Sequence, residues 1–224
     1  GGSAGIAGAI GARFALEHWR YGYALDETST PDGSAGLFFY DARGESVHEI
    51  HADSETDAPR YARVIDLHAS FDQSCGEEIV LASPRMLAPR PELGTWLRTA
   101  EGAVPVAVSG VPDLLAAVRR EAIGVSVTVR SPGVAQRFTG LVHEVAATAS
   151  GVALEAPWVR VRVALQHLRE AWAVQIPSID GPVTSIELLD ASATVVLSVA
   201  GACTPSKPEA TLWRELVTRL EPAA

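Results

Sequence analysis

An internal repeat is the feature that most constrains what this chain can fold into. In two places, an apolar segment that contains a histidine and an arginine leads through an Asp-Gly loop into two β-rich runs joined at an aspartate. An amphipathic segment with an aromatic residue near its start closes each copy. Similarity at this scale predicts two related structural units that each form the same elements. The matching segments are residues 13–27 and 162–176, 36–50 and 185–199, and 59–67 and 211–220.

Each copy is expected to form antiparallel strands and a helix. Apolar and polar residues alternate in residues 36–50 and 188–199, which is typical of strands with one face in a core. Asp41 and Gly44 supply turn residues between two such runs. Leucines at 212, 216 and 220 fall at helical spacing. The predicted fold class is therefore α+β, with two related antiparallel β-sheet units and flanking helices.

The second copy is longer than the first, and this sets the expected domain boundaries. Residues 112–120 predict a short helix, and residues 125–164 predict several further strands that the first copy lacks. Four prolines in residues 72–110 favour a linker with one helical turn around Trp96. The expected organisation is a first, partial repeat over residues 1–71, a linker over 72–110 and a second repeat over 111–224.

Composition excludes several classes of function. The formal net charge is −9, which argues against a general nucleic-acid binder, because phosphate backbones attract clustered basic surfaces. No apolar run approaches the roughly 20 residues that span a bilayer, so no membrane insertion is expected. Cys75 and Cys203 have no metal-ligand spacing, which favours reduced thiols over one long-range disulfide. The small-residue start lacks a basic region, so we expect no signal peptide.

Five segments carry a family resemblance. They are GLFFYDARGESVHEI at 36–50, RSPGVAQRFTGLV at 130–142, EAWAVQIPSIDG at 170–181, GPVTSIELLDASATVV at 181–196 and PEATLWREL at 208–216. Together they resemble the hemin-degrading family of the HemS/ChuS/HmuS type. Their order and spacing carry the resemblance, since no single motif is diagnostic. The resemblance implies a cytoplasmic protein of haem-iron utilisation with an α+β fold of broad antiparallel sheets and flanking helices.

The resemblance also implies haem as the ligand, and it leaves the role of the protein open between haem carriage and haem degradation. The implied partners are haem, a haem-uptake transporter and, for degradation, an electron donor that works with O₂ while the haem iron performs the redox chemistry. Two features depart from the family pattern. The region that should hold the axial histidine, residues 96–110, contains no histidine, and residues 200–203 replace a Tyr-Gly-x-Arg pattern.

Haem binding requires an apolar slot, an axial ligand such as neutral histidine, and cations for the propionates. His68 has the best local context for an iron ligand, because it ends a predicted helix and is followed by Phe71. The alternative for every candidate is a solvated surface residue. The propionate candidates, which lie near the resembling segments, are Arg119, Arg130, Arg137 and Lys207.

Two further hypotheses follow from the same residues. A non-catalytic relative that kept the fold, lost the haem pocket and acts as an interaction or scaffold domain would explain both departures from the family pattern. Alternatively, a homodimer interface completes the pocket. No GxSxG, P-loop or HExxH motif points to another enzyme class.

Overall fold

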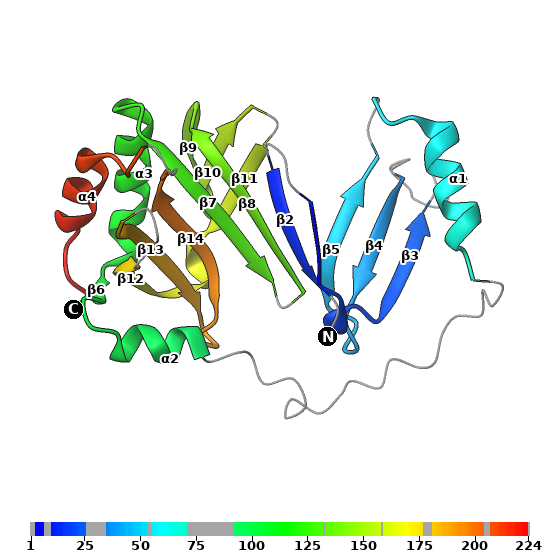
Figure 1. Cartoon of the computed structure of the whole chain (residues 1–224), viewed down its shortest axis with the longest axis horizontal. Helices are drawn as coiled ribbons and strands as arrows, with labels where there is room; N and C mark the ends of the chain where they lie inside the picture. Colours follow the sequence, from blue (N-terminus) through cyan, green and yellow to red (C-terminus); the bar gives the residue numbers. More distant parts are fainter. Residues whose placement is uncertain are drawn as a thin grey trace. The chain divides into compact units, whose positions relative to one another are not determined.

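The computed structural model of the chain describes residues 3–6, 10–25, 35–52, 55–70, 92–131, 133–157, 159–176, 181–203 and 207–223 (Figure 1). Contacts divide the chain into two compact units. Unit 1 comprises residues 1–4, 14–87 and 132–134. Unit 2 comprises residues 5–13, 88–131 and 135–224.

A large antiparallel sheet of eight strands forms the centre of unit 2. Its strands run in the order β1-β2-β8-β7-β14-β13-β12-β6. In the middle of the sheet, Ser198 on β14 is paired with Thr128 on β7 and with Glu187 on β13, so these three side chains share one face. The strands are β1 (Ser3–Ile6), β2 (Ile10–Ala15), β6 (Val104–Val106), β7 (Gly124–Ser131), β8 (Val134–Leu141), β12 (Leu168–Ile176), β13 (Val183–Asp190) and β14 (Val195–Gly201).

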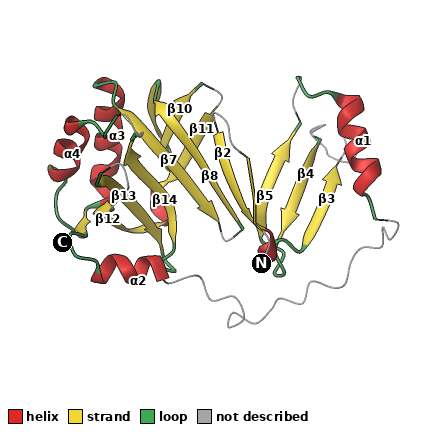
Figure 2. Ribbon diagram, in the orientation of Figure 1, coloured by secondary structure: helices red, strands yellow, loops and turns green. Residues whose placement is uncertain are grey.

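The core of unit 2 lies on the opposite face of this sheet. Val127, Ile186 and Val199 point into it and pack against α3 (Val111–Arg120) and α4 (Thr211–Thr218), which lie together on that side (Figure 2). A second sheet completes the same core, with the order β11-β10-β9. Its strands are β9 (Glu144–Thr148), β10 (Gly151–Ala156) and β11 (Val159–Ala164).

A buried polar contact fixes α4 to the sheet. Glu209 accepts hydrogen bonds from the backbone N–H and the hydroxyl of Thr184, at 2.7 and 2.8 Å. The fully buried Trp213 donates its indole N–H to the Thr184 carbonyl at 2.9 Å. Gly201 allows this close approach, because a Cβ there would lie 2.6 Å from the Trp213 ring. The helix is thereby held in one position by satisfied buried groups.

The face of the large sheet that points away from α3 and α4 is partly covered by α2 (Glu92–Thr99). Leu97 of α2 is fully buried against Val174, Leu189 and Val195. Strand β6 then pairs with β12 and forms the edge of the sheet, and η2 (Val108–Gly110) leads into α3. The sequence predicted a linker over 72–110, whereas residues 92–110 form these elements because they bury an apolar side chain and complete a sheet edge. Residues 71–91, which include Cys75, lie outside the described residues.

Unit 1 contains a three-stranded antiparallel sheet, β3 (Tyr21–Leu25), β4 (Gly36–Tyr40) and β5 (Ser46–His51), and the helix α1 (Ala58–His68). Asp57 caps α1 by accepting a hydrogen bond from the Arg60 N–H at 3.1 Å. No side chain of α1 is buried. Tyr61 ties the helix to the edge of β3 through a hydrogen bond from its hydroxyl to the Leu25 carbonyl at 3.1 Å.

An aromatic cluster packs one face of the unit 1 sheet. Trp19 contacts Phe39 and Phe14, with ring centroids 4.5 and 5.5 Å apart, and donates its indole N–H to the Gly133 carbonyl at 3.0 Å. His48 lies beside the same rings, 5.8 Å from Phe14. Burial lowers the pKa of His48, and the nearby charge of Glu49 opposes this shift.

The two repeat copies form the same turn. Asp41 follows β4 and accepts hydrogen bonds from the N–H groups of residues 43 and 45, at 2.7 and 3.0 Å. Asp190 ends β13 and accepts from those of residues 192 and 194, at 2.8 and 3.0 Å. Each turn has a residue at positive φ, Gly44 at 77° and Ala193 at 60°. A 3₁₀ turn also precedes β3 and β12 alike, η1 (Leu16–His18) and η3 (Leu165–His167).

The predicted fold class is confirmed: antiparallel sheets with flanking helices form both units. The strands predicted within 125–164 are β7 to β11, and the predicted closing helix is α4. In the described part of the chain, no helix has the length and apolar character needed to cross a membrane.

Candidate functional site

The face of the large sheet that α3 and α4 leave uncovered carries a group of polar side chains, which we name the polar face. Its central members are almost completely buried, with exposed fractions of 2% for Ser185, 5% for Glu187 and 6% for Ser198. Buried polar groups are retained only where they find hydrogen-bond partners. The polar face consists of Ser126, Thr128, Arg130, Arg137, Thr139, Ser185, Glu187 and Ser198.

Glu187 is the centre of the polar face. Its two carboxylate oxygens accept hydrogen bonds from Ser185 and Ser198, both at 2.5 Å. Burial raises the pKa of Glu187, while the two serine hydroxyls and the charge of Arg130 act in the opposite direction. A carboxyl group in this setting takes up a proton at higher pH than an exposed one. The polar face therefore contains a carboxyl group whose protonation depends on its burial and on the charge of Arg130.

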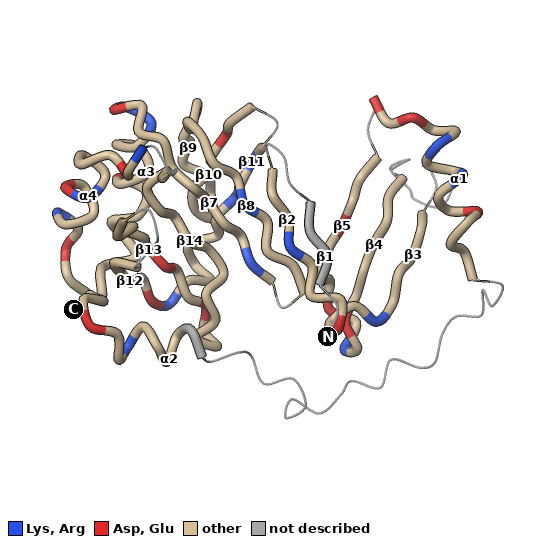
Figure 3. The backbone as a smooth tube through the Cα atoms, in the orientation of Figure 1, with Lys and Arg blue, Asp and Glu red and all other residues tan. Residues whose placement is uncertain are grey.

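Arg137 extends across from β8 to β7. Its Nε donates to the Ser126 hydroxyl at 2.6 Å, and that hydroxyl is 2.6 Å from the Thr139 hydroxyl. Arg130 projects from β7 on the same face and acts on the charge of Glu187. Both arginines are exposed, and Figure 3 marks basic positions on β7 and β8. Two guanidinium groups on neighbouring strands can bind a pair of carboxylates.

The structure brings together two of the five predicted site residues. Arg130 and Arg137 share the polar face. Arg119 lies in the last turn of α3, where its Nε donates to the His143 carbonyl at 3.1 Å. Lys207 is exposed in the connection that precedes α4. Because α3 and α4 pack on the other side of the sheet, Arg119 and Lys207 do not join the polar face. His68 is the exposed last residue of α1 in unit 1.

One end of the polar face is closed by α2. Glu170 forms an ion pair with Arg98 of this helix and accepts a hydrogen bond from the Trp172 indole at 2.9 Å. The hydrogen bond from Trp172 lowers the pKa of Glu170, and Arg98 adds to this effect while burial opposes it. These contacts hold α2 in place and leave the end with Arg130 and Arg137 open to solvent.

Sequence reasoning missed Glu187 and its two serines. The signal was present, because a carboxylate interrupts the apolar run Ile186 to Leu189, and Ser185 stands two residues before it on the same face. Among the described residues of the strands that form the polar face, none is a histidine. No cluster of three or more metal-ligating side chains occurs in the described part of the chain.

Fold and site together define a class: an α+β protein built from antiparallel sheet units, with a polar sheet face that carries paired arginines suited to an anionic ligand. The family model described as the haemin-degrading HemS.ChuX domain matches residues 93–220, which is more than half of the chain. The chain therefore belongs to this haemin-degrading family, as its sequence motifs predicted.

Several relatives align with nearly the whole chain. The hemin transport protein HemS of Yersinia enterocolitica is 22% identical over 237 residues, covering 93% of this chain and 69% of HemS. Among solved structures, the heme-binding protein PhuS from Pseudomonas aeruginosa, in its holo form, has a TM-score of 0.85 at 20% identity. The alignment covers 99% of this chain and 73% of PhuS. ChuS, an E. coli heme oxygenase, has a TM-score of 0.80 at 20% identity, covering 99% of this chain and 76% of ChuS. These structures share the fold.

Proposed function

We propose that this chain binds haem and serves in haem-iron utilisation in the cytoplasm. The observation that carries the proposal is the family match over residues 93–220, because that range contains every strand of the polar face. The relatives support the same ligand, since one is a hemin transport protein, one a heme-binding protein and one a heme oxygenase.

Arg130 and Arg137 are the proposed propionate anchors. Haem carries two carboxylates, and arginine binds carboxylates through two parallel hydrogen bonds. The two side chains start from neighbouring strands, which lie about 4.8 Å apart in a sheet. Arg137 is already oriented by its hydrogen bond to Ser126. The polar face thus fits the acidic edge of haem, and it supplies no histidine for the iron.

His68 remains the sequence-based proposal for the axial ligand. The proposed partners are haem, a haem-uptake transporter that delivers it and, if haem is degraded, an electron donor. A homodimer that completes the pocket is the alternative source of a ligand. The competing function is a relative that kept the fold and acts as an interaction domain, which the missing histidine of the polar face favours.

Hemin titration followed in the Soret region tests the proposal. The parent protein should give a saturable shift. The double variant Arg130→Ala, Arg137→Ala should bind more weakly, because each lost charge-assisted contact is worth about 1.5–3 kcal/mol, or roughly 10- to 100-fold in affinity. Arg119→Ala is the matched control, since it removes an arginine on the other side of the sheet.

Two results would count against the proposal. Equal affinity in the double variant and in the Arg119→Ala control would exclude the polar face as the propionate site. A parent titration with no more shift than a protein that has no haem site would favour the interaction-domain alternative. Size-exclusion mass with and without hemin addresses the homodimer, because a monomer with full affinity excludes it.

A further inference from the structure

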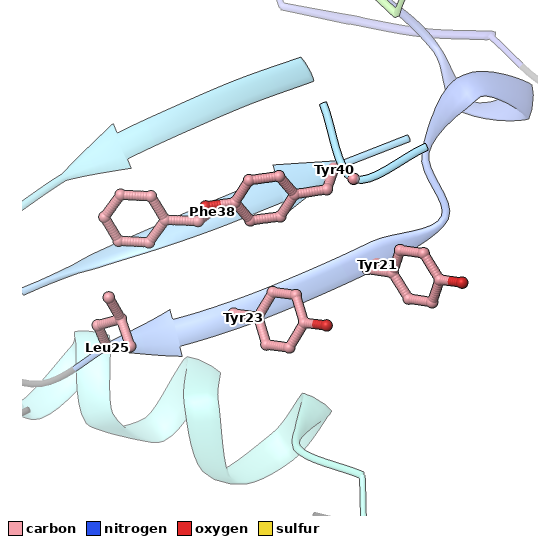
Figure 4. A pocket seen from close by; sticks show the side chains of 6 residues that line it. Tyr21, Tyr23, Leu25, Phe38 and Tyr40 are labelled. Atoms are coloured by element: carbon pink, nitrogen blue, oxygen red, sulfur yellow. The ribbon is translucent and has the colours of Figure 1, made fainter. Parts of the chain in front are cut away.

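Unit 1 carries an open groove on the sheet face opposite the Trp19 cluster. The groove has a volume of about 350 Å³, and Figure 4 shows side chains of β3 and β4 along its floor. Tyr23, in the middle of β3, is 48% exposed, so the groove is open to solvent. Exposed apolar surface of this kind commonly marks an interaction site. We name it the aromatic groove, and its lining residues are Tyr21, Tyr23, Leu25, Phe38, Tyr40 and Gly44.

The sheet of unit 1 has the same register as the corresponding strands of unit 2. Tyr23 pairs with Phe38 in unit 1. Their repeat counterparts, Trp172 and Glu187, pair in the same way in unit 2. The pairings of β4 with β5 and of β13 with β14 also shift register at the same step, just before the turn aspartate. Residues of the two sheets can therefore be matched one to one.

In unit 2, the matching face holds the helix α2, and three of its residues show how. Leu97 is fully buried in an apolar cluster, and Arg98 forms an ion pair. Gly94 passes the turn after β13 so closely that a Cβ would lie 2.3 Å from a carbonyl oxygen of that turn. The helix therefore needs a glycine at this point. The residues of unit 2 that form its seat are Glu170, Trp172, Val174, Leu189, Ala193 and Val195.

The aromatic groove is the same seat in unit 1. The counterparts of the six residues under α2 are, in order, Tyr21, Tyr23, Leu25, Tyr40, Gly44 and Ser46. All of them except Ser46 line the groove. The helix α1 contributes no residue to the lining. The groove thus lies where a helix equivalent to α2 would pack, and in unit 1 this position is open.

The charge at the end of the seat differs between the two units. Arg98 of α2 pairs with Glu170, whose counterpart in unit 1 is Tyr21. The exposed guanidinium of Arg20 lies 5.9 Å from the centroid of the Tyr21 ring. A helix in the aromatic groove would meet a cation where α2 meets a carboxylate. An acidic residue is therefore favoured at the position that Arg98 has in α2.

We propose that the aromatic groove docks an amphipathic α-helix of a partner protein, in the way that unit 2 holds α2. The helix has a leucine that packs between Leu25 and Tyr40, and a glycine three positions earlier that passes the turn at Gly44. An acidic residue directly after the leucine pairs with Arg20. Helix-in-groove recognition uses such anchors at helical spacing. The α2 segment of a second copy is disfavoured, because its Arg98 would face Arg20.

Fluorescence anisotropy of labelled helical peptides tests the docking on the whole 224-residue chain without hemin. Each peptide has about 15 residues, since shorter isolated helices are marginal in water. Two peptides share the pattern glycine-x-x-leucine and differ only in the next residue, which is glutamate in one and arginine in the other. The glutamate peptide should bind saturably and about 2- to 5-fold more tightly than the arginine peptide, as an exposed ion pair allows.

Three variants of the chain locate the binding. Tyr23→Ala should weaken both peptides by about 10- to 30-fold, because aromatic side chains at the centre of an interface carry much of the affinity. Ile50→Ala is the matched control and should leave both affinities unchanged. Ile50 is 47% exposed and pairs with Leu37, so it lies on the other face of the same sheet. Arg20→Glu should reverse the order of the two peptides.

A third peptide, with leucine in place of the glycine, tests the position of the helix without any change to the protein. It should bind at least 10-fold more weakly, because its side chain would overlap the turn at Gly44. Equal binding of this peptide and the glutamate peptide would overturn the proposal, even if Tyr23→Ala proved unstable. So would the absence of saturable binding by the parent, equal affinities in Tyr23→Ala and Ile50→Ala, or an order of peptides that survives Arg20→Glu. Hemin plays no part in these measurements, so their failure would leave the proposed function untouched.

Discussion

Replacing Glu187 by leucine tests how the polar face is held together. The substitution removes the carboxylate that accepts hydrogen bonds from the hydroxyls of Ser185 and Ser198, which are 2% and 6% exposed. A buried donor without a partner costs about 1–3 kcal/mol, so the two together should lower the free energy of unfolding by about 2–6 kcal/mol. Leucine fills a similar volume, which keeps any cavity contribution small.

A triple variant provides the internal control. Ser185→Ala, Glu187→Leu, Ser198→Ala removes donors and acceptor together, and exchange of all partners for apolar groups is close to neutral. The triple variant should therefore recover most of the stability that Glu187→Leu loses. Urea unfolding followed by tryptophan fluorescence measures both, and similar midpoints for the single and triple variants would refute the reasoning.

The pH dependence of the free energy of unfolding provides a second test of Glu187 and its two serines. Burial raises the pKa of Glu187 above its ordinary value, so between those two values the folded state holds a proton that the unfolded state has lost. Stability must then fall as pH rises through that window. Glu187→Gln should lack this fall while it keeps hydrogen-bonding groups for both serines. Parallel stability–pH curves for Glu187→Gln and the parent would contradict the assignment.

Three further changes test the fold by denaturant unfolding. Ala193→Gly should stabilise the chain by about 0.5–1 kcal/mol, because alanine is strained at a φ of 60°. Gly44→Ala at the matching turn should destabilise the chain, and effects of the same sign in both variants would refute the shared turn. Gly133→Ala should cost about 1–3 kcal/mol, since its Cβ would overlap Val47, and a neutral effect would contradict that packing. Trp213→Phe should cost about 1–3 kcal/mol by leaving a buried carbonyl without its donor, and an unchanged midpoint would count against that bond.

Periodic segments could be predicted from sequence, because their pattern is set by one dominant core. The strand alternation of 125–130 and the helical spacing of residues 212–220 reflect burial against the same apolar layer, and both elements are present. On the helix, Trp213 and Val217 are buried, whereas Leu212 of the leucine row is exposed. The helix α2 was predicted only as one helical turn around Trp96 within a linker, and it is longer than that. Among the described side chains of this helix, Leu97 is the one that is fully buried, and the nearby prolines resemble those of a linker.

Burial of single side chains was harder to predict than elements. Two tryptophans on helices differ in this respect: Trp213 on α4 is fully buried, whereas Trp96 on α2 is 40% exposed. The alternation of β7 correctly separated Thr128 and Arg130 from the core face. Whether the polar side of a strand is also buried depends on which strands become its neighbours. No local sequence pattern indicates those neighbours.

The residues of unit 1 are not contiguous in the chain, and this affects the order of events during synthesis. Trp19 and Ala15 both donate to the carbonyl of Gly133, which belongs to the turn between β7 and β8. Domains commonly fold from the N-terminus onward as they leave the ribosome. Unit 1 cannot complete its hydrogen bonds in that way until more than half of the chain has emerged. The earliest segments to be translated are thus among the later ones to reach their final packing, and a fragment that ends at residue 71 would lack the acceptor.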